Sequence, residues 1–278
     1  MNSLFITLSK KCSKLTTQTY STSFTLGIQT LDSELHDPIY SIYGFVRFAD
    51  EIVDSFHEYD KYKLLKKFED DCFDAIKHKI SLNPILNSFQ HVVNQYNIDH
   101  TLIKYFLESM YMDLDEIDYN QEKYEKYILG SAEVVGLMCL KVFVQKNRKL
   151  YEELKPAAQK LGSAFQKINF LRDLNSDYVK LGRIYFPNIN MNNFNTKNKE
   201  LIELDIKKDF KEGLKGIKKL PQKSRGGVYL AYLYYIELLI KIKKKSPKDI
   251  LKDRIRINNF IKFTLLLKSK IQNQLNLI

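Results

Sequence analysis

The feature that most constrains the fold is the recurrence of apolar residues at three- and four-residue spacing along nearly the whole chain. Only 10 glycines and 6 prolines interrupt its 278 residues, so long segments can remain helical. Sustained apolar–polar alternation, which is typical of strands, does not occur. We therefore expect an all-α fold with its helices around a common centre and residues 1–278 in one domain. The pattern predicts helices over residues 5–20, 37–57, 61–79, 84–96, 100–116, 121–145, 149–180, 199–219, 224–244 and 248–276.

The net charge of +11 favours anionic partners, which include nucleic acid, a membrane surface and phosphorylated substrates. Neither a zinc-finger spacing nor a tail rich in lysine and arginine supports nucleic acid, so we expect no nucleic-acid partner. Attraction to a membrane surface is a secondary expectation.

The three cysteines, Cys12, Cys72 and Cys139, lie far apart, which is typical of reduced thiols in the cytosol. The apolar stretch near the N-terminus is too short for a signal peptide. No run approaches the roughly 18 apolar residues of a membrane span. We expect a cytoplasmic protein that is soluble or attached only peripherally to the inner face of a membrane.

One polar stretch, RFADEIVD at 47–54, stands inside an apolar segment. At 3.6 residues per turn, Arg47, Asp50 and Asp54 lie on one face of the predicted helix. The solvated face of an amphipathic helix would explain such a stretch by itself. Glu51 then either supports this cluster without binding a ligand itself or is an ordinary surface residue.

A second predicted helix also has a polar face. Its residues, spaced three, four and four apart, are Gln166, Asn169, Asp173 and Asp177. The chain therefore carries two Asp-x-x-x-Asp pairs, and four carboxylates would converge if their helices face each other. Such a cluster repels itself unless cations fill it, and magnesium prefers oxygen ligands. Arg47 and Arg172 could hold phosphate oxygens beside it. Two amphipathic helices that carry this spacing by chance remain the alternative.

Five blocks together carry a resemblance to a known family: STSF (21–24), IYGFVRFADEIVD (42–54), GSAEVVG (130–136), QKINFLRDLNSDYVKLGRIYFP (166–187) and YLAYLYYIELL (229–239). In order and spacing, over roughly residues 10–265, the chain resembles the phytoene and squalene synthases, and most of all the bacterial phytoene synthases. These are head-to-head prenyl diphosphate synthases. The resemblance implies an all-α isoprenoid synthase fold that encloses a central cavity.

The resemblance also implies a prenyltransferase of carotenoid biosynthesis. It would join two molecules of geranylgeranyl diphosphate, through prephytoene diphosphate, into phytoene. Magnesium would be required, with manganese able to substitute, and no nicotinamide cofactor is expected. One alternative is a squalene or dehydrosqualene synthase acting on farnesyl diphosphate, of which squalene formation would need NADPH. Another is a non-catalytic assembly factor for respiratory complexes with the same fold.

The resemblance assigns roles to individual residues. The expected catalytic and metal-binding carboxylates are Asp50, Asp54, Asp173 and Asp177, with Asn169 as an added metal ligand. The expected substrate-binding residues are Ser21, Ser23, Phe24, Tyr43, Arg47, Gln166, Arg172, Arg183, Tyr185 and Tyr235.

Two positions depart from the family pattern. Leu129 stands where the family often has a tyrosine, so that tyrosine is either absent or replaced from another position, with Tyr127 nearby. Glu133 replaces a glycine. A carboxylate facing a hydrocarbon tunnel would be costly, so we expect Glu133 to point away or to pair with lysine or arginine. The GSAEVVG block should both pack helices closely and form a tunnel wall.

Overall fold

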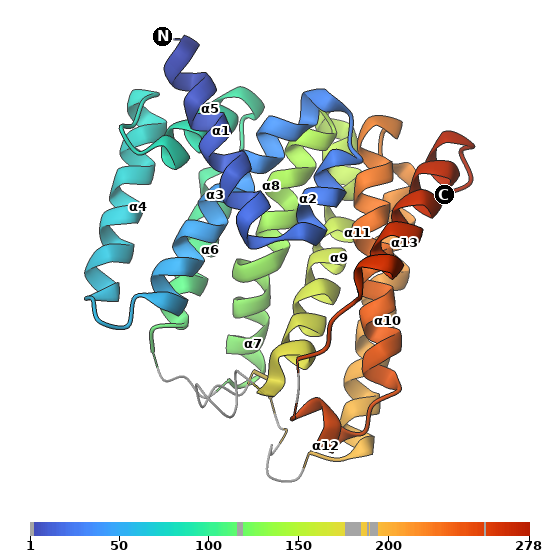
Figure 1. Ribbon diagram of the computed structural model, residues 1–278. Helices are drawn as coiled ribbons and strands as arrows, with labels where there is room; N and C mark the ends of the chain where they lie inside the picture. The colour runs from blue at the N-terminus through green and yellow to red at the C-terminus, as the bar shows by residue number, and fades with distance from the viewer. Residues whose placement is uncertain (1–2, 116–118, 176–184, 188, 190–193, 253) are drawn as a thin grey trace.

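The computed structural model describes residues 3–115, 119–175, 185–187, 189, 194–252 and 254–278. Every regular element in these ranges is a helix, which confirms the predicted all-α class (Figure 1). The longer helices run up and down beside one another in Figure 1. In chain order the elements are α1 (Ser3–Tyr20), α2 (Thr22–Gln29), α3 (Ser33–Ser55), α4 (Lys61–His78), α5 (Pro84–Tyr96), α6 (His100–Met112), α7 (Gln121–Ile128), the π-helical turn η1 (Leu129–Glu133), α8 (Val134–Phe143), α9 (Arg148–Leu174), α10 (Thr196–Lys219), α11 (Gln222–Lys243), α12 (Pro247–Ile250) and α13 (Asn259–Gln274).

Short polar side chains determine where most helices begin. Asp60 accepts a hydrogen bond from the backbone N–H of Lys63 at the start of α4. Asn147 accepts one from Leu150 in the same way at the start of α9. Such caps satisfy N–H groups that have no partner inside the helix, so the helix begins directly after the capping residue.

The same capping explains two differences from the predicted boundaries. The segment 248–276, predicted as one helix, is instead α12 and α13, because Asn258 caps a new start by accepting from Ile261 N–H. The helix expected from residue 37 begins at Ser33, where Asp32 provides the cap. α2 was not among the predicted helices, and Ser21 caps it.

The predicted helix 121–145 is present as α7, η1 and α8 in direct succession. Glycines allow close packing around η1. A Cβ atom on Gly130 would lie 2.4 Å from the carbonyl oxygen of Tyr105, and one on Gly162 would lie 2.9 Å from that of Ala132. The expectation that the GSAEVVG block packs helices closely is therefore confirmed at Gly130 and Ala132.

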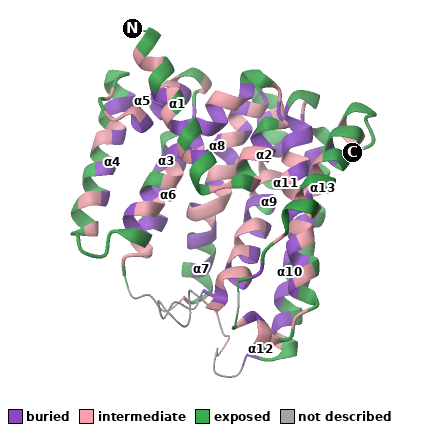
Figure 2. Cartoon of the chain, in the orientation of Figure 1, coloured by how far each residue is buried: buried purple, intermediate pink, exposed green. Residues whose placement is uncertain are grey.

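Two hydrophobic clusters form the core, and both contribute to the walls of one cavity. The first cluster joins α3, α4, α5, α6 and α8. At its centre the ring of Phe45 stacks on that of Phe89 with centroids 4.0 Å apart. The second cluster joins α7 and α9–α11. Figure 2 shows the buried residues along the inner faces of these helices. The assignment of residues 1–278 to one domain stays a prediction.

Within the described ranges, none of the helices combines the length and the apolar character that a membrane span requires.

Candidate active site

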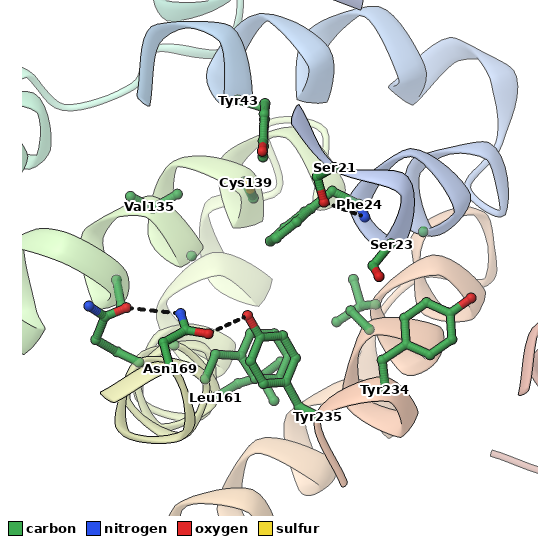
Figure 3. A pocket seen from close by; sticks show the side chains of 18 of the residues that line it. Ser21, Ser23, Phe24, Tyr43, Val135, Cys139, Leu161, Asn169, Tyr234 and Tyr235 are labelled. Carbon is green, nitrogen blue, oxygen red and sulfur yellow. Dashed lines mark hydrogen bonds between the residues drawn. The ribbon is translucent and has the colours of Figure 1, made fainter. Parts of the chain in front are cut away.

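A cavity of about 860 Å³ lies among α2, α3, η1, α8, α9, α10 and α11. This volume is near the upper end of the range of about 300–1,000 Å³ that is usual for small-molecule sites. The block GSAEVVG and the turns after it form one wall, as expected, with Ser131, Ala132, Val135, Gly136 and Cys139 in the lining (Figure 3).

The cavity is apolar at one end and polar at the other. The apolar end is lined by Leu140, Phe143, Leu154, Ile217 and Leu220. The polar end is lined by Arg47, Asp50, Asp54, Asn169, Arg172 and Asp173. Along α9, Leu154 and Asp173 are separated by about 28 Å at 1.5 Å of rise per residue. The cavity thus extends along much of α9 and suits a ligand with a charged head and an extended apolar tail.

At the polar end, Arg47 connects the acidic residues of α3. Its guanidinium donates to Asp50 and to Glu51, and lies over the ring of Tyr20 at 4.2 Å from the centroid. Burial and the neighbouring charge of Asp54 raise the pKa of Asp50 to about 7, although Arg47 acts in the opposite direction. Glu51 therefore supports the cluster through Arg47. The high pKa of Asp50 indicates that additional positive charge would be favourable here.

On the other side of the polar end, the charged residues come from the end of α9 and from a segment that is distant in the sequence. Asp173 accepts from Arg172 Nε at 3.1 Å, and its Oδ1 lies 2.7 Å from Arg254 Nε. Arg254 was not predicted as a site residue, because its segment was interpreted as part of a helix. Arg256 and Lys262 also line the cavity. The predicted residues Asp177 and Arg183 lie outside the described ranges.

A chain of hydrogen bonds positions the amide predicted as a metal ligand (Figure 3). Tyr235 Oη donates to Asn169 Oδ1 at 3.2 Å, and Asn169 Nδ2 donates to Gln166 Oε1 at 3.2 Å. The ring of Tyr235 stacks on that of Phe165 with centroids 3.9 Å apart. Burial raises the pKa of Tyr235, so this phenol remains a donor. All four side chains line the cavity.

The predicted residues of α2 and α3 face the cavity from the other side (Figure 3). Ser21 Oγ accepts from the backbone N–H of Phe24 at 3.2 Å and so begins α2. The ring of Phe24 lies 5.2 Å from that of Tyr43. Burial raises the pKa of Tyr43 to about 12. Ser23 also lines the cavity. The structure therefore brings the N-terminal block and the two aspartate faces to one cavity.

Asp113, directly after α6, is a site residue that the sequence analysis did not identify. Its carboxylate accepts from Tyr127 Oη at 2.7 Å and from Tyr185 Oη at 3.2 Å. Both tyrosines line the cavity, and the charge of Asp113 contributes to the raised pKa of Asp50. No motif or spacing marks this aspartate, because its contacts depend on how the helices assemble.

The two departures from the family pattern have structural explanations. Tyr127 lines the cavity, whereas Leu129 is absent from the lining. Tyr127 lies in the last turn of α7, directly before the π-helical turn that begins at Leu129. A tyrosine is therefore present at the cavity from another position. Glu133 does not line the cavity, as expected, and accepts from Gln159 Nε2 at 3.1 Å.

Among the described residues, no three or more His, Cys, Asp or Glu side chains are grouped closely enough to hold a metal ion. Asp177, one of the expected ligands, lies outside these residues. Asp50, Asp54 and Asp173 nevertheless line the same cavity as the amide of Asn169. These are the oxygen donors that magnesium prefers, and the raised pKa of Asp50 is consistent with a site that favours a cation. Magnesium binding stays a prediction.

Residues 17–260 match the squalene/phytoene synthase family. The chain belongs to this family. It is 25% identical over 270 residues to phytoene synthase 1, chloroplastic, of Solanum lycopersicum, covering 90% of this chain and 63% of that protein. It is 28% identical over 194 residues to 4,4′-diapophytoene synthase of Staphylococcus haemolyticus (strain JCSC1435), covering 67% of this chain and 65% of that one. The family member described here thus spans less than two thirds of either relative's length.

A solved structure confirms the fold. The crystal structure of a dehydrosqualene synthase in complex with a ligand superposes with a TM-score of 0.83 at 20% identity, over 97% of this chain and 98% of that chain. The predicted family and the all-α isoprenoid synthase fold are therefore both confirmed.

Proposed function

We propose that this member of the family is a prenyltransferase that joins two molecules of geranylgeranyl diphosphate head to head and forms phytoene, in carotenoid biosynthesis. The observation that carries the proposal is the long cavity, with carboxylates and arginines at one end and apolar side chains at the other. A prenyl diphosphate has the same division between an anionic head and a hydrocarbon tail. Family membership supports the same class of substrate.

The reaction balances without a reductant. The C–O bond of the first substrate breaks, and its electron pair leaves with the diphosphate. The double bond of the second substrate attacks the resulting allylic cation, and loss of a proton gives the cyclopropyl compound prephytoene diphosphate. Its own C–O bond then breaks, the carbon skeleton rearranges, and a second proton is lost. Two diphosphates and two protons leave for each phytoene formed.

The residues at the polar end suit the departing diphosphate. Arg47, Arg172 and Arg254 bring positive charge to the place where negative charge develops. Their planar guanidinium groups can hold two phosphate oxygens at once. Before substrate binds, these arginines pair with nearby carboxylates, so the site is positioned in advance.

The aromatic residues beside the polar end suit the carbocations. Phe24, Tyr43 and Phe165 line the cavity, and the face of an aromatic ring attracts a cation. The apolar walls exclude water, which would otherwise quench the cation as an alcohol.

Magnesium when bound would supply charge neutralisation for the diphosphate. The residues that would hold it, or manganese in its place, are Asp50, Asp54, Asn169, Asp173 and, outside the described ranges, Asp177.

A second candidate is the formation of a thirty-carbon product from farnesyl diphosphate. One relative is named a diapophytoene synthase, and the superposed crystal structure is that of a dehydrosqualene synthase. The length of α9 that lines the cavity, about 28 Å, favours the longer substrate. A non-catalytic assembly factor would not require carboxylates and arginines that line a cavity.

The proposal is tested by a product assay. The purified protein, with magnesium and geranylgeranyl diphosphate, should form a forty-carbon hydrocarbon that mass spectrometry identifies. Added NADPH should change neither its yield nor its mass. Farnesyl diphosphate is tested in parallel. A preferred thirty-carbon product would overturn the choice of substrate, a product that needs NADPH would indicate squalene synthesis, and no product from either substrate would overturn the enzymatic assignment.

A further inference from the structure

The helix α13 packs one side against α11 and leaves the opposite side exposed. Its inner side packs on α11, where buried Ser269 donates to the carbonyl oxygen of Gly226 at 2.8 Å. Its outer side carries five large apolar side chains at spacings of three, four, four and four residues, which places them on one face. With their exposed fractions they are Phe260 (75%), Phe263 (57%), Leu267 (44%), Ile271 (54%) and Leu275 (63%).

These five residues, here called the α13 stripe, extend over about 23 Å of helix at 1.5 Å per residue. Figure 2 shows this outer side of α13 as exposed. Isolated exposed apolar residues are common, but a continuous row of them on one helix face is typical of an interaction surface. The α13 stripe therefore needs a partner that accepts apolar side chains.

The charges around the α13 stripe have one sign. Residues 254–278 contain five lysines and arginines and no aspartate or glutamate. Two of these cations, Lys268 and Lys270, flank the stripe on either side. A row of apolar side chains bordered by lysines is typical of helices that lie in the interface of a membrane with anionic lipids.

The α13 stripe begins at the rim of the cavity. Asn259 and Lys262, in the first turn of α13, line the cavity. Lys262 Nζ also donates to Thr22 Oγ1 at 3.0 Å and so connects α13 to α2. A surface that accepts the stripe would therefore lie next to this rim.

We propose that the α13 stripe docks onto a membrane leaflet that contains anionic lipids, with Phe263 and Leu267 inserted among the acyl chains. The same basic residues argue against a second copy of this chain, because two such faces would repel each other. The docking of the α13 stripe onto a membrane does not depend on the proposed function. Only the advantage of having the cavity rim at the membrane rests on that function. Prenyl diphosphates and their hydrocarbon products partition into lipid, so a cavity rim at the membrane would shorten their path.

The proposal is tested by sedimentation with vesicles in the absence of substrate. Vesicles of phosphatidylglycerol and phosphatidylcholine should retain the protein, and vesicles of phosphatidylcholine alone should retain much less. The double variant Phe263→Ser with Leu267→Ser should lower the partition coefficient at least about tenfold, because it removes apolar area from the interface. The double variant Lys268→Gln with Lys270→Gln should lower it about tenfold on anionic vesicles.

The matched control is Leu201→Ser with Leu204→Ser on α10, where two leucines are similarly exposed at 60% and 52%. It should bind anionic vesicles like the wild type. Circular dichroism and thermal melts should be unchanged in all variants, since every altered side chain is exposed.

Wild-type protein that binds neither kind of vesicle, or a Phe263→Ser/Leu267→Ser variant that binds as the wild type does, would overturn the proposal. So would a wild-type dimer, in analytical ultracentrifugation, that becomes a monomer in this variant. Because substrate is absent and the altered residues do not line the cavity, a failed product assay leaves this result unaffected.

Discussion

The phenol of Tyr127 donates a 2.7 Å hydrogen bond to the carboxylate of Asp113, which joins the cavity wall at the end of α7 to the end of α6. Tyr127 is buried, and burial and the charge of Asp113 raise its pKa well above the ordinary value. The phenol therefore remains protonated and keeps donating at every working pH. This contact fixes the position of a ring that lines the cavity.

Removal of that hydroxyl should weaken the protein and slow the reaction. In Tyr127→Phe we expect the free energy of unfolding to fall by about 2 kcal/mol, because a buried hydrogen bond to a charged acceptor is lost. Turnover should fall as well, since Asp113, which also accepts from Tyr185 in the cavity wall, loses one of its phenol donors. Denaturant titration and product assays measure both effects. Tyr105→Phe, at an exposed tyrosine of α6, is the control, and equal effects of the two changes would contradict a specific role.

The two aspartate faces should both be needed for turnover. Asp50→Asn and Asp173→Asn should each lower kcat at least about 100-fold, because each removes charge from the end of the cavity that receives the diphosphate. Both carboxylates line the cavity and belong to neither hydrophobic cluster, so circular dichroism should show an intact fold. Near wild-type activity of either variant in the presence of magnesium would refute the assignment.

Stability should depend on pH through Asp50. Its pKa is raised to about 7 in the folded protein, mainly by burial and then by Asp54, whereas an unfolded aspartate titrates near about 3.9. The folded state therefore holds this proton more tightly, and its stability should decrease as pH rises from about 4 to about 7. Thermal melts of metal-free protein across this range should show the decrease. In Asp50→Asn it should be smaller, and an unchanged slope would contradict the assignment to Asp50.

Lysine should not replace the arginines at the polar end. Arg47 donates through its two terminal nitrogens to Asp50 and Glu51, and one ammonium group cannot reproduce this planar arrangement. Arg47→Lys and Arg172→Lys should each lower kcat/KM at least about tenfold. Arg148→Lys, at the exposed start of α9, is the control. Full activity of the first two variants would limit these arginines to a structural role.

A larger side chain inside the cavity should shorten the accepted substrate. Ala158 lines the cavity between Leu154 at the apolar end and Leu161 nearer the polar end. Ala158→Phe should therefore lower activity on geranylgeranyl diphosphate at least about tenfold more than activity on farnesyl diphosphate. Ala158→Ser, which keeps the volume, should retain the wild-type preference. An unchanged preference in Ala158→Phe would place the bound tail elsewhere.

Spacing along a single helix could be interpreted from the sequence alone. The three-and-four pattern predicted most helices, and it placed Arg47, Asp50 and Asp54 on one face. The residues brought to one cavity from α3 and α9 follow from such patterns together with the resemblance to the family. Periodicity alone could not indicate whether the two faces meet.

Contacts that depend on the path of the chain between helices could not be predicted. Arg254 reaches Asp173 from residues 254–258, which are not helical, whereas the same apolar spacing had predicted a continuous helix there. Asp113 acquires its role only because α6 ends beside α7. Likewise, the pattern of α13 indicates a helix but does not distinguish the side that packs on α11 from the side that remains exposed.

The lining of the cavity by α9 has a consequence for how substrate length could evolve. Leu154, Ala158, Leu161 and Asp173 belong to one continuous helix, so the depth available to a hydrocarbon tail is divided into helical turns of about 5.4 Å. Moving a bulky side chain by one turn would move the floor by that amount. Selectivity among prenyl chains would then change in discrete steps, through single substitutions that leave the diphosphate end untouched.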